Sequence, residues 1–467
     1  MAENLTSSYL TRTPDTPTAT KKYTLSVWLK AFNHNTGDYN YVISSDAGGA
    51  RREHITFEDA LEPFFKWYHR HSDNTVSNLS TQAVYRDESG WYHLVVCFDS
   101  AQATAADRVK IYINGSRITH FRTETHIVQN TDSNINNAGS HAPKIGMIGQ
   151  GTGSAQDGAW NGLMSHFHFC DGYAYDASAF GEEDATTGAW KIKTSPSVSY
   201  GANGYFIFKD SANLSGSTVQ DQSGNSNDWT VSNGTITNTK DSPSNNYSTL
   251  NPLHHNKENL SNGTIEYRNG NTQFKATNTA GNAVTLSTFA VDKGKYYCEA
   301  KLTAIGGAYP GIGILGTNQS NSIYGSNEYI GKYSNGWTYG SNGSSYSLLN
   351  SDSWASYGDS YTTGDYIGIA VDMDNNKLYY SKNGTWQNSG TGISITAGKT
   401  YHFGCNGNNN CIWDWNFGNG VFGTTALTGT TYTGADGNGI FKYDPNSITL
   451  DSTTKSFKSL STKGLNA

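Results

Sequence analysis

The chain has little charge and none of the long apolar runs that cross a membrane. Only 15% of its 467 residues are charged, and the net charge of −7 is spread along the sequence without a basic stripe. A protein that binds nucleic acid needs such a stripe to neutralise phosphates. No segment approaches the roughly 18 apolar residues of a membrane helix. We therefore expect neither a nucleic-acid partner nor membrane insertion.

Cysteines and export signals are also scarce. The cysteines number five, and Cys97, Cys170 and Cys298 lie in apolar or aromatic strand patterns, which is typical of buried free thiols. Cys405 and Cys411 flank a short loop and could pair with each other. The N-terminus lacks the apolar segment of a signal peptide. We expect no disulfide framework, and synthesis in a cytoplasm without export by the standard route.

Aromatic residues and glycine are abundant instead. Aromatics reach 13%, and 51 glycines stand against 9 prolines, so disorder is not expected despite the low hydrophobic content of 35%. This composition indicates short strands joined by many tight turns. The length predicts two or three domains rather than a single core.

The clearest structural signal is the stretch Thr363–Trp386. Two β-rich runs flank a turn cluster at Asp372–Asn376, and the second run ends in Asn383-Gly384, a pair that favours a type I′ turn. A looser copy of this hairpin lies in the first half of the chain and ends in Asn114-Gly115. Two copies this far apart predict two β-sandwich domains.

Alternating apolar residues predict further strands, and no segment before Asp176 has a helical period. In the first half these strands are Tyr23–Lys30, His54–Phe57, Phe64–Tyr68, Trp91–Phe98, Val109–Ile113, Lys144–Ile148 and Leu163–Cys170. The fold class is therefore all-β. We divide the chain into an N-terminal arm (1–20), a first sandwich (21–195), a connector strap (196–253), a second sandwich (254–430) and a C-terminal strap (431–467). The connector carries aromatic residues, so we expect it to pack along one or both domains.

Residues 20–195 resemble the concanavalin A-like jelly roll of the laminin G-like superfamily. The residues that carry the resemblance are Trp28, Gly90–His93, Lys110–Gly115, Ala159–Leu163 and Asp171–Ala179. These motifs mark the fold and say little about a ligand.

Residues 255–425 resemble a SPRY domain, and this similarity is the more specific of the two. Val291–Ala300 is similar to the opening strand of that family, and Gly311–Leu315, Gly364–Asp372 and Leu378–Trp386 match later strands. Asn416–Gly418 is a typical ending. The resemblances imply two tandem β-sandwich domains, a jelly roll followed by a SPRY-like sandwich, with irregular straps.

The order of the whole chain is similar to that of structural proteins from tailed bacteriophages. In that order a jelly roll precedes the connector Asp221–Trp229, the SPRY-like domain and a Lys-Gly-Leu-Asn ending at 463–466. The resemblance implies a virion protein made in the host bacterial cytoplasm, with other virion proteins as partners and many copies or a homo-oligomer. A tail fibre or receptor-binding component that attaches to bacterial cell-surface polysaccharide is the first interpretation. A head decoration or head fibre protein is the alternative, because no heptad run for a fibre shaft is present.

Catalytic groups are hard to find. The best carboxylate candidates are Glu58, Asp59 and Glu62, but retaining glycosidases need two carboxyl groups about 5–5.5 Å apart. Asp59 directly follows Glu58 and would point to the opposite face of a strand. We therefore expect no catalytic residues and no enzyme activity. A glycan-degrading enzyme of the concanavalin A-like superfamily remains the alternative from a different class.

Metal-binding patterns are equally incomplete, so no metal and no cofactor is expected. Asp372–Asn376 begins like a calcium loop but lacks the later glycine and glutamate, which favours a hairpin turn. The pairs His69/His71 and His166/His168 each share a strand face, but without an evident third ligand half-exposed histidines are expected. A calcium ion held by scattered residues such as Asp157 and Asp171 stays open.

The remaining candidate site is an aromatic surface within residues 334–361. There tryptophan and tyrosine alternate with serine, asparagine and glycine, the composition of recognition loops whose rings can stack on sugars. The predicted glycan-binding residues are Trp337, Tyr339, Tyr346, Trp354 and Tyr357. The alternative is that some of these are core residues, because Trp337 and Tyr339 alternate as in a strand.

Overall fold

A computed structural model describes most of the chain in two compact units. The described residues are 8–32, 39–46, 51–58, 62–138, 142–148, 158–210, 214–256, 263–277, 279, 281–307, 309–318, 323, 325, 327–341 and 346–466. The first unit comprises Met1–Asn238 with Ser242–Ser244, and the second comprises Thr239–Asp241 with Asn245–Ala467. Within the described residues no helix is long and apolar enough to cross a membrane.

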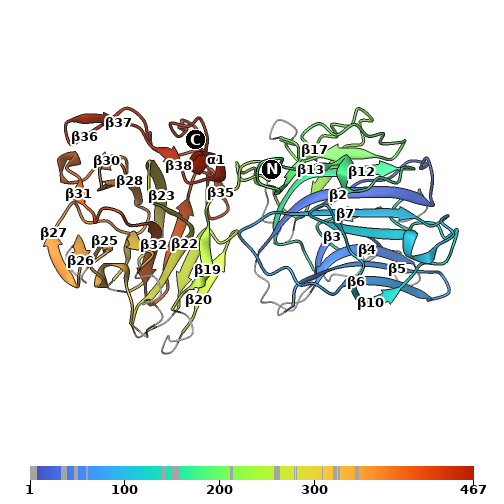
Figure 1. Ribbon diagram of the computed structural model, residues 1–467, viewed down its shortest axis with the longest axis horizontal. Coiled ribbons are helices and arrows are strands. Elements are labelled where there is room, and N and C mark those ends of the chain that lie inside the picture. The colour runs from blue at the N-terminus through green and yellow to red at the C-terminus, as the bar shows by residue number, and fades with distance from the viewer. Residues whose placement is uncertain are drawn as a thin grey trace. The chain divides into compact units, whose positions relative to one another are not determined.

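The first unit is a sandwich of two antiparallel sheets (Figure 1). One sheet has the order β10 (Phe121–Thr125), β6 (Val76–Thr81), β5 (Phe64–Arg70), β4 (Arg52–Glu58), β3 (Asn40–Asp46), β11 (Lys144–Ile145), β1 (Tyr9–Thr11), β18 (Trp229–Ser232), β17 (Thr218–Val219) and β16 (Leu214–Ser215). The other has the order β15 (Tyr205–Ile207), β12 (Gly162–Asp171), β2 (Lys22–Ala31), β7 (Tyr92–Asp99), β8 (Val109–Ile113) and β9 (Ser116–Arg117). A small ribbon of β13 (Gly181–Glu183) and β14 (Trp190–Ile192) and the 3₁₀ turns η1 (Ala105–Asp107) and η2 (Ala177–Ala179) complete it.

The second unit is also a sandwich. Its first sheet has the order β19 (Leu250–His255), β22 (Ala283–Val291), β32 (Tyr401–Gly407), β24 (Gly311–Gly316), β25 (Gly336–Ser341), β26 (Tyr346–Asn350) and β27 (Ser353–Ser356). Its second sheet has the order β20 (Ile265–Arg268), β21 (Gln273–Ala276), β33 (Cys411–Asn416), β23 (Lys295–Ala304), β28 (Tyr366–Asp372), β29 (Lys377–Lys382) and β30 (Thr385–Trp386), with β31 (Ile393–Ser394) beside β29 and β38 (Lys458–Ser459) beside β23. Shorter elements are η6 (Ile330–Lys332), η7 (Asn388–Gly390), β34 (Val421–Phe422), β35 (Thr425–Ala426), β36 (Ile448–Leu450), β37 (Thr453–Lys455) and α1 (Thr462–Asn466).

Both predicted hairpin turns are present, and local backbone chemistry explains them. Asn114 and Gly115 have φ of 47° and 82°, and Asn383 and Gly384 have φ of 49° and 84°. Positive φ at both positions is what a type I′ turn requires, and asparagine and glycine tolerate it best. The turn at Asp372–Asn376 likewise connects β28 to β29, and Asp372 bonds the Asn375 amide at 3.1 Å. The all-β fold predicted from sequence is confirmed.

The N-terminal arm differs from its expected form. Instead of an extended polar arm, Tyr9–Thr11 forms β1 inside a sheet, paired with β11 on one side and β18 on the other. Leu10 is 1% exposed, so this short strand adds to the core. The Arg12 guanidinium then donates to the Asn203 carbonyl and to the Asn227 side chain, which ties the arm to the connector. A polar composition did not reveal this pairing, because the partner strands lie far away in sequence.

The connector is shared between the two units. Tyr205–Ile207 forms β15 against β12, and Trp229 begins β18, so residues up to 238 complete the first sandwich. Leu250–His255 forms β19 against β22 of the second sandwich. Tyr205 and Trp229 are 2% and 0% exposed, which accounts for the aromatic residues of the connector.

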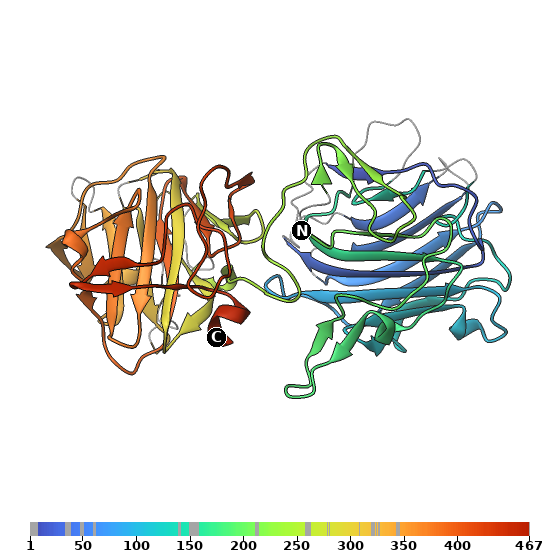
Figure 2. The same ribbon diagram turned by 90° about the horizontal axis from the view of Figure 1, so that it is seen from above.

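The C-terminal strap is part of the second unit. Figure 2 shows this red segment lying across the strands of its sheet. Strand β38 runs parallel to β23, and Lys455 forms a 2.9 Å ion pair with Asp372, both nearly inaccessible. The buried Glu299 carboxylate accepts the backbone amides of Lys442 and Tyr443 at 2.9 and 2.8 Å. Charged groups this deep need partners, so these contacts specify where the strap lies.

Candidate functional site

Most of the predicted aromatic surface lies inside the second sandwich, which corrects the expectation that it is displayed. Trp337 and Tyr339 on β25 are 6% and 0% exposed, and Tyr357 is 7% exposed. The Tyr380 hydroxyl donates to the Trp337 carbonyl at 3.1 Å, so the backbone is also engaged. Trp337 and Tyr339 alternate along a strand, and the facing sheet buries that side. These rings are therefore not available for stacking on a ligand, and the core alternative holds for them.

Two predicted aromatics remain. Trp354, on β27, is 38% exposed and lines a cleft on the outer side of the β25 sheet. The side chain of Tyr346 lies outside the described residues. Of the five predicted glycan-binding residues, Trp354 is thus the one whose described side chain lines a cleft.

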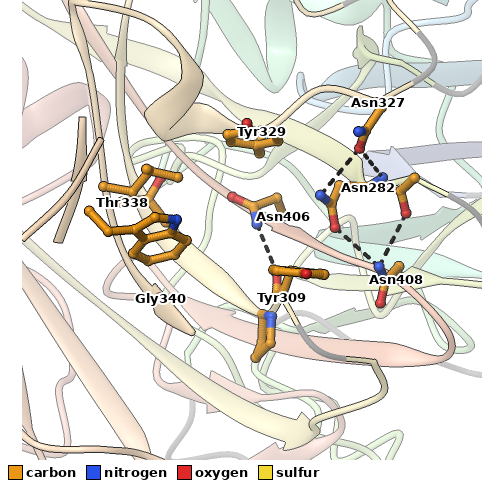
Figure 3. A pocket seen from close by; sticks show the side chains of 12 residues that line it. Asn282, Tyr309, Asn327, Tyr329, Thr338, Gly340, Asn406 and Asn408 are labelled. Carbon is orange, nitrogen blue, oxygen red and sulfur yellow. Dashed lines mark hydrogen bonds between the residues drawn. The ribbon is translucent and has the colours of Figure 1, made fainter. Parts of the chain in front are cut away.

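The cleft has a volume of about 340 Å³ and gathers residues from strand ends that are distant in sequence (Figure 3). Asn282 precedes β22, Tyr309 precedes β24, and Asn406 lies on β32. The described lining residues are Gly281, Asn282, Tyr309, Pro310, Asn327, Tyr329, Thr338, Gly340, Leu349, Trp354, Asn406 and Asn408. None of these side chains is charged.

Glycines on β24 let neighbouring groups approach the strand closely beside the cleft. Gly311 on β24 lies between Asn406 of β32 and Gly340 of β25 in the register of the sheet. A Cβ atom at Gly311 would lie 2.5 Å from Cγ2 of Thr338 and 2.9 Å from Nδ2 of Asn406, so a larger residue would not fit. The isoleucines that alternate with glycine on β24, Ile312 and Ile314, are fully buried on the inner face. The strand therefore presents core side chains on one face, and its glycines let Thr338 and Asn406 of the cleft pack closely over the other.

Three hydrogen-bond acceptors in the cleft are buried without a partner among the described residues: one is Oδ1 of Asn408, and the other two lie on strands of the sheet. Nδ2 of Asn406 donates to the Tyr309 carbonyl at 3.0 Å, which fixes the amide and leaves Oδ1 unsatisfied. Oγ1 of Thr338 is also buried and unsatisfied. These residues are 4% and 2% exposed. An unsatisfied buried polar atom is costly and is often explained by a function, so a donor from a ligand is the natural partner.

The other side of the cleft is a chain of amides. Figure 3 shows the side chains of Asn327, Asn282 and Asn408 joined in series, with nitrogen–oxygen distances of 3.4 Å between the first two and 3.2 Å between the last two. Asn408 also donates to the Gly281 carbonyl at 3.2 Å. This network holds polar groups in fixed directions at the cleft edge, which limits the conformational entropy lost on binding.

Aromatic rings flank these amides. Tyr309 is 44% exposed and Trp354 is 38% exposed. The Tyr329 hydroxyl donates to the Asp352 carboxylate, and burial together with this bond raises the pKa of Tyr329 to about 12, so the phenol stays protonated. Half-exposed rings next to fixed amides suit a ligand with an apolar face and a rim of hydroxyl groups. No carboxylate, histidine, lysine or arginine side chain lines the described cleft.

Comparison with known families assigns both units. Residues 4–177 match the family described as the concanavalin A-like lectin/glucanases superfamily, of the laminin G type. Residues 295–432 match the SPRY domain family. The chain carries a concanavalin A-like domain and a SPRY domain in tandem. The cleft belongs to the unit that contains the SPRY domain, although Asn282 precedes the matched residues.

Solved structures resemble parts of the chain. The SPRY domain of human HERC1 is 15% identical, with a TM-score of 0.28, and the match covers 36% of this chain and 96% of that one. Stonustoxin is 13% identical, with a TM-score of 0.27, over 36% of this chain and 27% of the toxin. A Bacteroides ovatus protein, provisionally named a carbohydrate-binding protein, is 13% identical, with a TM-score of 0.33, over 50% of this chain and 59% of its own. Curated proteins give no significant match. The domain assignments rest on the family matches.

The carboxylates weighed as catalytic groups have structural partners. Glu58 forms a 3.1 Å ion pair with Lys66, and Glu62 forms one of 3.4 Å with Arg122. Asp59 lies outside the described residues.

Of the two calcium candidates in the concanavalin A-like domain, only Asp171 lies within the described residues. Asp171 is fully buried and accepts the amides of Thr18 at 2.6 Å and Asn203 at 3.0 Å, together with the Asn136 side chain at 2.7 Å. Its oxygens therefore serve as backbone anchors. Asp157 lies outside the described residues. Among the described residues no group of three or more histidine, cysteine or acidic side chains is arranged to hold a metal ion.

The histidine pairs are more buried than expected. His168 is 2% exposed and stacks on Phe206 with ring centroids 3.9 Å apart, and His166 is 8% exposed. Burial lowers the pKa of His166 to about 4. His69 is 2% exposed as well, so the expectation of half-exposed histidines is wrong for all three.

The residues missed by sequence reasoning are the asparagines of the cleft and the glycines of β24. Asn282, Asn406 and Asn408 stand in an asparagine-rich chain, where each looks like an ordinary turn residue. The usable signal was the alternation of Gly311 and Gly313 with isoleucine, because glycine along one face of a strand marks a close approach of other groups.

Proposed function

We propose that this chain is a non-enzymatic, carbohydrate-binding structural protein of a tailed-phage virion, with the SPRY-domain cleft as its glycan site. The observation that carries the glycan assignment is the pair of buried, unsatisfied acceptors, Oδ1 of Asn406 and Oγ1 of Thr338, beside half-exposed rings. The first domain belongs to a superfamily named for lectins and glucanases, which agrees with a glycan-binding role.

A neutral sugar fits this chemistry. Its hydroxyl groups can donate to both acceptors, and each restored hydrogen bond removes a penalty of about 1–3 kcal/mol. Its apolar ring face can stack on Trp354 or Tyr309. The uncharged lining offers no counter-ion to a carboxylate or sulfate, so neutral glycans are favoured over acidic ones.

Weak binding at one cleft is sufficient if many clefts act together. A shallow site with a few stacking and hydrogen-bonding contacts should have an affinity of about 1 mM, or roughly −4 kcal/mol. Linking many sites raises avidity by about 10²–10⁴. A virion that displays many copies would therefore hold firmly to bacterial surface polysaccharide.

Binding can be tested on arrayed neutral and acidic bacterial polysaccharides with the purified full chain. We expect Trp354→Ala and Thr338→Val to reduce binding to the neutral set at least tenfold. Tyr173→Ala is the matched control, because Tyr173 is 38% exposed like Trp354 but lies in the first unit. Full binding by both variants, with unchanged melting curves, would place the glycan contact elsewhere.

The virion role rests on the order of domains and straps along the chain. It is tested by a density map of intact particles, in which the chain should be found on the tail or, for the head decoration alternative, on the capsid. The absence of enzyme activity is tested by incubating the chain with the polysaccharide that binds best. New reducing ends would contradict the non-enzymatic assignment.

A further inference from the structure

A second polar hollow lies in the first unit, at the end of β5. It has a volume of about 150 Å³, and its lining includes His69, His71, Asp132 and Asn134. His69 is near the end of β5, and His71 directly follows the strand. Their side chains meet with ring centroids 4.5 Å apart and planes at 61°. The hollow is thus built around two adjacent imidazoles.

Each imidazole has a buried nitrogen for which the described residues supply no hydrogen-bond partner. These atoms are Nδ1 of His69 and Nε2 of His71. The His69 side chain is 2% exposed, so the protein rather than bulk water surrounds it. A buried ring nitrogen without a hydrogen-bond partner among the described residues calls for an explanation, and a ligand in the hollow would supply one.

The other ring nitrogen of His69, Nε2, makes a contact that selects the tautomer of this imidazole. Its Nε2 lies 3.2 Å from the Asp132 carbonyl oxygen, which accepts a hydrogen bond only from the protonated form of that nitrogen. The side-chain amide nitrogen of Asn134 lies 3.1 Å from the same Nε2 and could donate to it only in the other tautomer. It has a second acceptor, the Arg70 carbonyl at 3.3 Å, so Nε2 can keep its proton for the Asp132 carbonyl. A proton on Nε2 leaves a lone pair on Nδ1. Histidines that bind metals usually hold their second N–H on a carbonyl or carboxylate in this way.

The loop that carries Asp132 is held in place by Glu53, which is fully buried. The Glu53 carboxylate accepts hydrogen bonds from the Ser133 hydroxyl and the backbone N–H of Asn134, both at 2.7 Å. It also accepts the Trp67 indole N–H at 3.0 Å, two residues before His69 on β5. Glu53 therefore fixes β5 and the loop at 132–134 to one another. The contact between Nε2 of His69 and the Asp132 carbonyl is in place before any ligand binds.

We propose that the hollow binds a divalent transition-metal ion through Nδ1 of His69 and Nε2 of His71, with water completing the coordination. Imidazole nitrogen suits Cu²⁺, Ni²⁺ and Zn²⁺, and affinity should be highest for Cu²⁺. Calcium and magnesium prefer oxygen ligands and should not bind here. The site is an open, two-histidine one, because the described residues supply no third ligand of the histidine, cysteine or acidic type. Arg51, which also lines the hollow, is exposed to solvent.

The test is titration of the full chain with Cu²⁺ or Zn²⁺ by calorimetry, together with electron paramagnetic resonance of the Cu²⁺ form. We expect one bound ion per hollow and couplings from two imidazole nitrogens. His71→Gln should weaken binding at least tenfold and remove one nitrogen coupling, since loss of a supporting group alone costs about 10–100-fold. His120→Gln is the matched control, because His120 is an exposed histidine of the same unit.

Each other outcome overturns the proposal. Absence of binding by the wild-type chain would mean that water alone fills the hollow. Unchanged affinity in His71→Gln, or loss of binding in His120→Gln, would place the ion elsewhere. Melting curves accompany both variants, and the nitrogen couplings of the wild-type protein decide the question even if His71→Gln proves unstable. Ca²⁺ should give no heat, and a Ca²⁺ signal that depends on His71 would also contradict the assignment.

Discussion

Replacing Trp337 with alanine should strongly destabilise the second unit, because the ring is part of its core. Trp337 is 6% exposed and packs edge-on against Tyr401, with ring centroids 5.7 Å apart. A buried aromatic side chain removes about 150–250 Å² from water, which at 25 cal/mol per Å² corresponds to about 4–6 kcal/mol. Measured truncations of buried phenylalanine or tryptophan cost about 3–5 kcal/mol. At about 2–4 °C per kcal/mol for a unit of this size, the melting temperature should fall by about 6–20 °C.

Scanning calorimetry of the full chain measures this effect, with Trp354→Ala as the matched control. Trp354 is 38% exposed, so its truncation should shift the melting temperature by no more than a few degrees. The two variants remove the same side chain from the same sheet and differ in burial. A Trp337→Ala protein that melts within a few degrees of the wild type would refute the core placement of the ring. It would also restore Trp337 as a surface residue available for stacking.

Four further outcomes are expected. Thr338→Val should leave the melting temperature unchanged or slightly higher, because it removes a buried hydroxyl that has no partner among the described residues, while glycan binding falls. Acidification should destabilise the first unit. Burial lowers the pKa of His93 from 6.5 to about 3 and that of His166 to about 4. Between these values and pH 6.5 the unfolded chain therefore binds more protons than the folded one, which favours unfolding. The stability that these histidines contribute is present above pH 6.5 and is lost as the pH falls towards 3–4, which denaturant midpoints at several pH values would show. Lys455→Ala should lower the free energy of unfolding by about 3–5 kcal/mol in urea titrations, because it leaves the fully buried Asp372 carboxylate without its ion-pair partner at 2.9 Å. A decrease of less than about 1 kcal/mol would contradict a buried ion pair. Reducing agent should not change the melting temperature, because all five cysteines are free and buried, and a drop of more than a few degrees would reveal a disulfide.

The candidate site could be predicted only in part. The aromatic-rich stretch does approach a cleft, but it does so through Trp354, Thr338 and Gly340 rather than through Trp337 and Tyr339. Alternation shows that Trp337 and Tyr339 share a face. It does not show which face is covered, because that depends on a second sheet whose strands come from elsewhere in the chain.

What the sequence determined by itself is local. Asn114-Gly115 and Asn383-Gly384 form tight turns because both positions require positive φ, which asparagine and glycine readily adopt. The alternation in Tyr23–Lys30 likewise produces a strand with a buried apolar face, since neighbouring side chains point to opposite sides. Many such turns and strands in both halves of the chain predict two all-β sandwiches.

Tertiary structure decided everything that depends on which distant segments meet. It placed Tyr9–Thr11 between β11 and β18, although the arm is polar and short. It brought Asn282 and Asn406 to one cleft from the ends of two paired strands. Backbone hydrogen bonds between strands form whatever the side chains are. Which strands pair therefore follows from the burial of whole sheet faces and not from any local motif. Turns could therefore be predicted residue by residue, whereas the cleft exists only in the assembled sheet.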